Sequence, residues 1–181
     1  LNALAAIAVA TDEGVSDEAI VRGLAEFRGV GRRFQVANRD LDGMRVTVVD
    51  DYGHHPTEVS AVIDTTRRVW PERRIVMVYQ PHRYTRTRDL YDDFVRVLVQ
   101  VDMLVIVEVY SAGEDPIPGA DGRSLCHGIR QLGPLNPVFV ETPDEAYGVL
   151  SSILRDDDVV VVQGAGSVNQ VSNRLVAGTN D

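Results

Sequence analysis

The chain has no lysine, because each of its 18 basic residues is an arginine. This absence excludes a phosphate-loop lysine, a Schiff-base lysine and a lysine general base within these residues. A bound phosphate would have to be held by arginine side chains, by backbone N–H groups at helix N-termini, or by another domain.

Cysteine and long apolar runs are also scarce. The single Cys126 excludes an internal disulfide, and we expect it to pack as a small apolar residue on a helix face. No apolar run approaches the roughly 20 residues that span a bilayer, and no segment resembles a secretion signal. We therefore expect a cytoplasmic protein with no membrane partner. The net charge of −9 disfavours a nucleic-acid partner.

The pattern of residues 1–30 predicts two helices. Residues 1–11 are rich in Leu, Ala and Ile, which predicts a buried helix, and Ser16 would cap a second helix over residues 16–27. The first helix begins with neither a capping residue nor an initiator Met, so we expect the chain to be a piece of a larger protein. Glycines then interrupt the helical pattern, which predicts a boundary before a second segment, 31–181.

In this second segment, apolar runs alternate with helical patterns. Runs 46–49, 104–107 and 159–162 consist almost entirely of β-branched residues or Leu, as is typical of strands buried on both faces. The alternation with short connections predicts an α/β fold with a doubly wound, mostly parallel sheet. We expect strands over 34–37, 45–50, 73–79, 103–109, 137–141 and 158–163, and helices over 56–70, 88–100, 123–132, 143–154 and 166–176.

Two polar clusters follow strands that we expect to be neighbours. Residues 50–56 (DDYGHHP) and 81–87 (PHRYTRT) each lie between an apolar strand and a helix. Ligands of parallel sheets bind beyond the carboxyl ends of the strands, so both clusters should face one crevice. Arginine forks match phosphate and carboxylate, which favours an anionic substrate. Asp51 could accept hydrogen bonds from a ribose, or simply form a turn.

Three histidines in these clusters allow several interpretations. His54, His55 and His82 could bind a metal, but no cysteine lies nearby and consecutive histidines need not face one centre. His55 could instead cap the following helix, with one other imidazole bonded in the core. We favour a third interpretation, in which His54 and His82 contact the substrate.

The arginines of the second cluster also have two interpretations. Arg83 and Arg86 lie three residues apart and would repel each other unless an anion neutralised them. The alternative is a solvated charged loop with Asp89 and Asp92 nearby. The pair Arg32-Arg33, beside the predicted boundary, could reach an interdomain cleft or be ordinary surface charge.

Two further features remain ambiguous. Gly164-Ala165-Gly166-Ser167 opens the last helix, and we expect it to be a tight turn that allows close packing, although its N–H groups could bind an anion. Glu108 and Glu114 could bind an ammonium group or a hydrated metal, but for Glu114 we favour an exposed loop acid.

Six motifs occur in this order: residues 1–6 (LNALAA), 31–34 (GRRF), 50–56, 81–87, 114–121 (EDPIPGAD) and 163–166 (QGAG). Together they resemble the Mur ligases of peptidoglycan synthesis, and among them the UDP-N-acetylmuramate–L-alanine ligases. The resemblance covers essentially the whole chain, and it is carried most specifically by the two clusters at 50–56 and 81–87.

The resemblance implies the fold and the activity. Residues 31–181 would be a Rossmann-like C-terminal domain, preceded in residues 1–30 by the last two helices of a central ATPase domain. The UDP-binding and P-loop domains would lie outside this chain, so the chain alone should be inactive. In the whole enzyme, ATP with Mg²⁺ phosphorylates the lactyl carboxylate of UDP-N-acetylmuramate, and the amine of L-alanine attacks the acyl phosphate. This reaction serves cell-wall synthesis, and with it cell shape and division.

The resemblance also implies residue roles. It places Asn2, Arg33 and Asp51 at ATP, the central domain holding most of the nucleotide and Mg²⁺. It assigns no catalytic residue and no metal ligand to this chain. It places five residues around the acyl acceptor and the incoming alanine: Tyr52, His54, His82, Arg83 and Arg86.

Three alternatives remain open from the sequence. A sibling ligase that recycles murein tripeptide shares part of the first histidine motif. A nucleotide-binding module without chemistry would share the fold. A small metallohydrolase would use the histidine cluster and would bind stoichiometric zinc.

Overall fold

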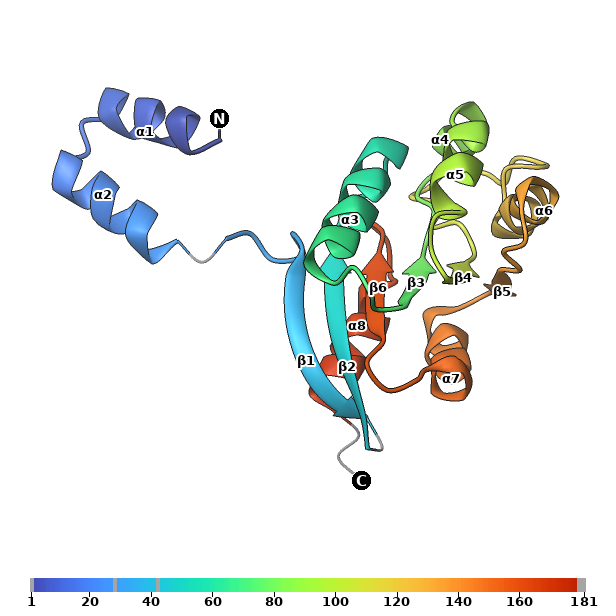
Figure 1. Ribbon diagram of the computed structural model, residues 1–181. Helices are drawn as coiled ribbons and strands as arrows, with labels where there is room; N and C mark the ends of the chain where they lie inside the picture. The colour runs from blue at the N-terminus through green and yellow to red at the C-terminus, as the bar shows by residue number, and fades with distance from the viewer. Residues whose placement is uncertain (1, 28, 42, 179–181) are drawn as a thin grey trace. The chain divides into compact units, whose positions relative to one another are not determined.

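The computed structural model describes residues 2–27, 29–41 and 43–178 (Figure 1). The chain divides into two compact units, Leu1–Gly31 and Arg32–Asp181. No helix among the described residues is long and apolar enough to cross a membrane.

The first unit is a pair of helices, α1 (Asn2–Asp12) and α2 (Asp17–Glu26). The hydroxyl of Ser16 accepts a hydrogen bond from the Ala19 backbone N–H at 3.4 Å, so the predicted cap is confirmed. The predicted burial of the first helix is wrong within this unit, because Leu4 is 66% exposed. Two helices of this length present too little surface to enclose each other's apolar faces.

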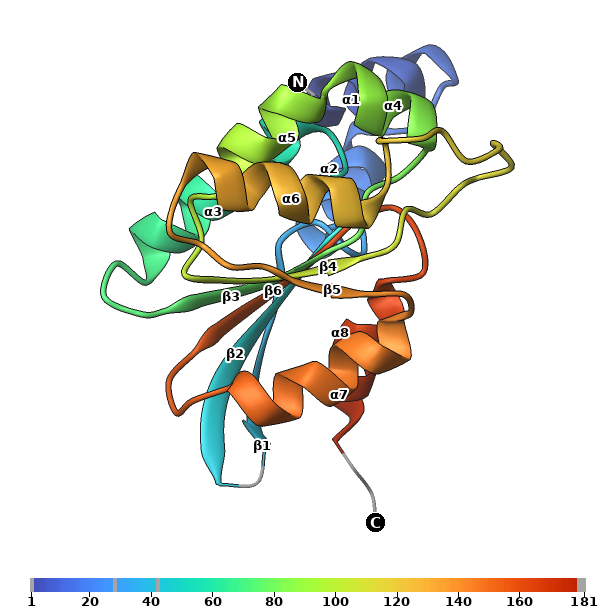
Figure 2. The ribbon, with the colours of Figure 1, turned by 90° about the vertical axis from the view of Figure 1, so that its right-hand side faces the viewer.

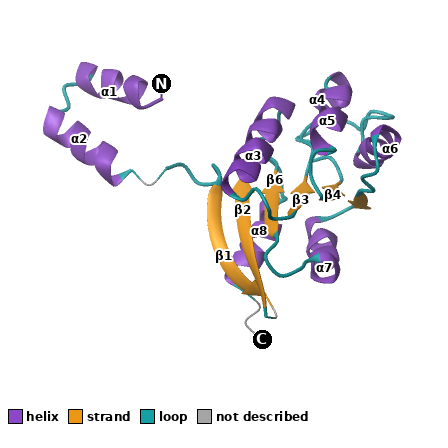
Figure 3. Ribbon diagram, viewed as in Figure 1, coloured by secondary structure: helices purple, strands orange, loops and turns teal. Residues whose placement is uncertain are grey.

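The second unit is built on a six-stranded sheet with the strand order β1-β2-β6-β3-β4-β5 (Figure 3). Strand β1 is antiparallel to β2, and the other pairs are parallel, which confirms the predicted α/β class. Its elements are β1 (Gln35–Leu41), β2 (Met44–Asp51), α3 (Pro56–Val69), β3 (Ile75–Tyr79), α4 (Tyr84–Asp89), α5 (Tyr91–Leu98), β4 (Met103–Val107), α6 (Gly122–Leu132), β5 (Val138–Val140), α7 (Pro143–Ile153), β6 (Val159–Gln163) and α8 (Asn169–Ala177).

Helices cover both faces of the sheet. Helices α3, α5 and α6 pack on one face, and α7 and α8 on the other (Figure 2). In β6, Val159 and Val161 face the first core, while Val160 and Val162 face the second. This two-sided burial explains the uninterrupted apolar runs, because successive side chains of a strand point to opposite faces. Cys126 is buried on α6, as predicted.

Two predicted elements differ from the structure. Strand β1 extends to Leu41, well past the predicted residue 37, because backbone pairing with β2 holds polar edge residues that have no apolar signal. The predicted helix 88–100 is two helices separated at Leu90. The first of them, α4, starts at Tyr84, inside the second polar cluster, while α5 packs an apolar face into the core.

Candidate functional site

The two predicted polar clusters meet at the carboxyl edge of the sheet. The sequence suggested that strands β2 and β3 are neighbours, but β6 lies between them. The loops that follow β2 and β3 nevertheless converge over the end of β6, because the rings of His54 and His82 lie 5.4 Å apart between centroids. The expectation of one shared corner is therefore confirmed, although the assumed strand order is wrong.

Aromatic rings and imidazoles form a row across this edge. Tyr52 meets His54 edge-on at 5.7 Å, and Tyr110, which follows β4, stacks on His82 at 5.5 Å. The two tyrosines at the ends of the row are 40% and 43% exposed. The row therefore gives the corner a partly apolar surface that a substrate can reach.

Arg86 determines which ring nitrogen of His82 carries the proton. Its Nη1 lies 3.0 Å from the His82 carbonyl oxygen and 3.3 Å from His82 Nδ1. Because a guanidinium only donates, Nδ1 must accept, which places the proton of the neutral ring on Nε2. Burial lowers the pKa of His82, and the neighbouring charges of His54, Arg86 and Arg83 lower it further. His82 is therefore a neutral donor at pH 7.

Arg83 is held differently from Arg86. Its Nη1 lies 3.3 Å from Glu114 Oε1, so the two form an ion pair. Glu114 also accepts bonds from Thr85, at 3.0 Å from the backbone N–H and at 2.7 Å from the hydroxyl. These bonds from Thr85 and the Arg83 pair lower the pKa of Glu114 to about 2. The interpretation of Glu114 as an exposed loop acid is wrong.

The loops after β3 and β4 are joined through their backbones. Arg83 N–H donates to the Tyr110 carbonyl oxygen at 2.8 Å, and Tyr110 N–H donates to the Pro81 carbonyl oxygen at 2.9 Å. Arg83 has a φ of 73°, in the left-handed region that non-glycine residues rarely occupy. Such strain persists only where surrounding contacts impose it, and it is common at functional sites.

The side chains of Asp51 and His55 hold the first cluster in place by accepting hydrogen bonds. Asp51 is buried and accepts bonds from the N–H of Phe34 at 2.9 Å, from the N–H of Gly53 at 2.7 Å, and from Gln163 Nε2 at 3.2 Å. The capping interpretation of His55 is confirmed, because its Nδ1 accepts from a backbone N–H in the first turn of α3.

Glu58 completes this helix cap. Its carboxylate accepts the N–H groups of His54 and His55 at 2.9 and 3.0 Å. Burial opposes ionisation of Glu58, but these two bonds together lower its pKa. The histidine loop therefore has a fixed backbone.

Arg32, for which the sequence offered an interdomain or a surface role, joins parts of the second unit instead. Its Nη2 donates to the Gly164 carbonyl oxygen at 2.7 Å, and its Nε lies 3.2 Å from Asp50 Oδ2. Its guanidinium also lies 5.3 Å from the centre of the Tyr52 ring. Burial raises the pKa of Asp50, and the Arg32 cation opposes that rise. Arg32 thereby joins the ends of β2 and β6.

The glycine turn after β6 is a packing feature, as predicted. A Cβ on Gly166 would lie 2.5 Å from Gln80 Oε1 and 2.6 Å from Tyr110 Cβ. Gln80 Oε1 accepts the Val168 N–H at 2.9 Å, which ties the turn to the end of β3. The carboxylate of Glu108 is likewise bonded within the protein, since its Oε1 accepts hydrogen bonds from the Val109 and Gly122 N–H groups.

Arg33 and Asn2 are the remaining predicted site residues. The side chain of Arg33 is 59% exposed and lies 3.8 Å from Glu58. Asn2 begins α1, and its side chain lies outside the described residues. Within the described ranges, no three His, Cys, Asp or Glu side chains are grouped so that they could hold a metal ion.

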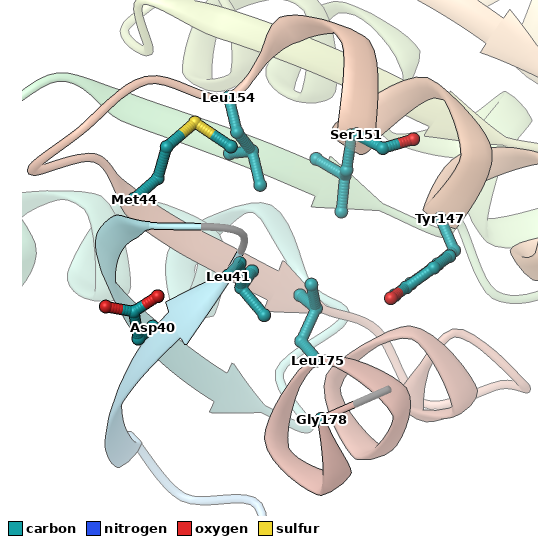
Figure 4. Close-up of a pocket in the computed structure, with 9 residues that line it drawn as sticks. Asp40, Leu41, Met44, Tyr147, Ser151, Leu154, Leu175 and Gly178 are labelled. Carbon is teal, nitrogen blue, oxygen red and sulfur yellow. The ribbon is translucent and has the colours of Figure 1, made fainter. Parts of the chain in front are cut away.

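A separate cavity lies at the opposite edge of the sheet, between the β1–β2 hairpin, α7 and α8 (Figure 4). Its lining combines apolar residues with the polar side chains of Asp40, Tyr147 and Ser151. No arginine or histidine lines it. The cavity therefore lacks the cations that an anionic substrate needs.

Residues 32–166 match the family model described as Mur ligase, glutamate ligase domain. The chain belongs to the Mur ligase family. The family consists of ATP-dependent ligases, and this chain carries its C-terminal domain, with the fold that the family implies.

Solved structures agree with this Mur ligase assignment. UDP-N-acetylmuramate–alanine ligase MurC from Thermotoga maritima is 33% identical with a TM-score of 0.68, over 97% of this chain and 36% of that one. A murein peptide ligase from Psychrobacter arcticus is 21% identical with a TM-score of 0.67, over 97% and 35%.

A more distant match is a bifunctional folylpolyglutamate synthase/dihydrofolate synthase from Yersinia pestis, in complex with AMPPNP and a Mn ion. It is 18% identical with a TM-score of 0.58, over 87% of this chain and 33% of that one. This chain thus spans about a third of the length of each of these proteins.

Proposed function

We propose that this chain is the amino-acid-binding part of an ATP-dependent ligase that joins L-alanine to UDP-N-acetylmuramate. The observation that carries the proposal is the corner formed by His54, His82 and Arg86, in which Arg86 supplies a positive charge. Among the described residues, no carboxylate lies within ion-pair distance of Arg86, whose guanidinium bonds only to neutral atoms of His82. An arginine in this state has charge available for the carboxylate of an incoming amino acid.

Arg86 rather than Arg83 is the primary anchor in this proposal. The charge of Arg83 is balanced by Glu114, whereas that of Arg86 is not. Arg86 also lies against His82, at the centre of the row of rings. The carboxylate would therefore bind at Arg86, with His82 Nε2–H as a second donor. Tyr52 and His54 would form the side of the corner that faces the acyl group.

The corner also suits the chemistry of amide formation. ATP supplies the phosphoryl group that activates the lactyl carboxylate. The amine of alanine then forms the C–N bond, the C–O bond to phosphate breaks, and the nitrogen loses a proton. Nearby guanidiniums disfavour an ammonium ion, so the corner would raise the fraction of amine in its nucleophilic form. The residues of this chain contribute mainly alignment.

This chain offers few side chains for contact with the nucleotide. Asp51 has three internal donors, which leaves little capacity for a ribose hydroxyl, and Arg33 offers an exposed guanidinium for the nucleotide. We propose that Asn2 also contacts the nucleotide. The described residues form no group suited to Mg²⁺. We propose that the unit Leu1–Gly31 belongs to a central ATPase domain of a longer cytoplasmic protein.

The test is a ligase assay on the full-length protein that contains this chain, with ATP and UDP-N-acetylmuramate. Phosphate release and product mass are measured with L-alanine, L-serine, glycine and the tripeptide L-alanyl-γ-D-glutamyl-meso-diaminopimelate. Higher identity to MurC than to the murein peptide ligase supports alanine as the preferred substrate. Preference for the tripeptide would overturn that choice, and no product with any of them would overturn the proposed reaction.

A further inference from the structure

The two arginines of the PHRYTRT segment differ in their net charge environment. Arg83 and Glu114 form a neutral pair, with Nη1 and Oε1 3.3 Å apart. Arg86 contacts His82, which is neutral at pH 7. Among the described residues, this side of the corner therefore presents one uncompensated positive charge, although the sequence places two guanidiniums there.

Glu114 is held firmly enough to keep this balance. Its carboxylate accepts two bonds from Thr85, one of which comes from the backbone of α4, and only 20% of its side chain is exposed. It reaches α4 from the loop after β4, and Arg83 N–H is bonded to that loop at Tyr110. Loss of the Glu114 charge would leave Arg83 as a second free cation beside the first.

We propose that Glu114 sets the charge selectivity of the amino-acid site. This proposal rests on the proposed function of the corner. With Arg83 neutralised, the site binds amino acids that carry one carboxylate and an uncharged side chain. An amino acid with a second carboxylate finds no free cation for it among the described residues, because Glu114 already pairs with Arg83. Glu114 acts through Arg83, so it is a positioning residue rather than a catalytic one.

The test compares acceptors in the full-length ligase. The variant Glu114→Gln removes the charge and keeps an amide oxygen for the Thr85 N–H. Its ratio of kcat/KM for L-glutamate to kcat/KM for L-alanine should rise about tenfold or more, because a like charge is replaced by a free cation. A merely structural role would lower both values and leave the ratio unchanged, which would overturn the proposal.

Two further variants separate charge from structure. Asp115→Asn removes one negative charge from an exposed position in the same loop, and it should leave the ratio unchanged. The double variant Glu114→Gln/Arg83→Gln restores the original charge balance, and its ratio should return toward the wild-type value. If Glu114→Gln does not fold, Arg83→Gln alone gives the test, because it should lower the ratio; a raised ratio would refute the proposal.

These outcomes distinguish the inference from the proposed function. A wild-type ligase that uses another uncharged amino acid would refute alanine as substrate, and the same ratio measured against that amino acid would still test Glu114. A wild-type ligase that prefers an acidic amino acid would overturn the role of Glu114 directly.

Discussion

The imidazoles of His54 and His82 lie 5.4 Å apart, although the strands that precede them are separated by β6. The two loops close over the end of β6 at a glycine. Gly164 N–H donates to the Asp51 carbonyl oxygen at 3.2 Å, and a Cβ at this position would lie 2.7 Å from the Gln80 carbonyl oxygen. The corner therefore depends on glycine in this turn, where a side chain would collide with the residue that follows β3.

This dependence predicts the effect of Gly166→Ala. The added methyl group would lie within 2.6 Å of Gln80 and Tyr110 atoms, so one of them must move. Overpacking of this kind costs about 1–3 kcal/mol. Urea denaturation of the 181-residue chain should show a loss of this size in the free energy of unfolding. Unchanged stability would contradict the packing role of the turn.

Gly148→Ala is the matched control for this variant. Gly148 lies inside α7, and apart from its chain neighbours and the nearby backbone of its own helix, no atom lies within 4 Å of its ideal Cβ. Alanine is favoured over glycine in a helix by up to about 1 kcal/mol, so this variant should be neutral or more stable.

His82 should titrate below the ordinary histidine pKa of 6.5. Burial and the charges of His54, Arg86 and Arg83 lower its pKa by disfavouring the imidazolium. Nitrogen NMR of the imidazole should show the proton on Nε2 above that pKa. Arg86→Ala should raise the pKa, because it removes a neighbouring cation and leaves the protonated ring less opposed.

Arg88→Ala provides the control for this titration. Arg88 lies on the same short helix and is paired with Asp89 at 2.8 Å. The pKa of His82 should not change in this variant. A His82 pKa above 6.5 in the wild-type chain, or a neutral ring protonated at Nδ1, would refute the arrangement described for Arg86 and His82.

The sequence predicted most elements and the chemistry of the corner because both leave local signals. Apolar runs such as 159–162 identified buried strands, and Ser16 identified a helix start. Polar residues directly after strands predicted which side chains face the ligand edge. These signals need only a few adjacent residues.

Long-range relationships left no such signal. Strand β6 lies between β2 and β3, and no local pattern of residues encodes that position. The pairing of Arg83 with Glu114 joins positions 31 residues apart. Arg32 could have been found only through its position beside a boundary, because its partners Asp50 and Gly164 are distant in the chain.

The central claim is that Arg86 binds the carboxylate of the incoming amino acid, and alanine kinetics of the full-length ligase test it most directly. Loss of a charge-assisted pair in a closed site costs about 2–5 kcal/mol, which is a ~30-fold or larger loss of kcat/KM. Arg86→Ala should show this loss for alanine with the KM for ATP unchanged, and Arg83→Ala should show a smaller one. Unchanged alanine KM and kcat in Arg86→Ala would contradict the account.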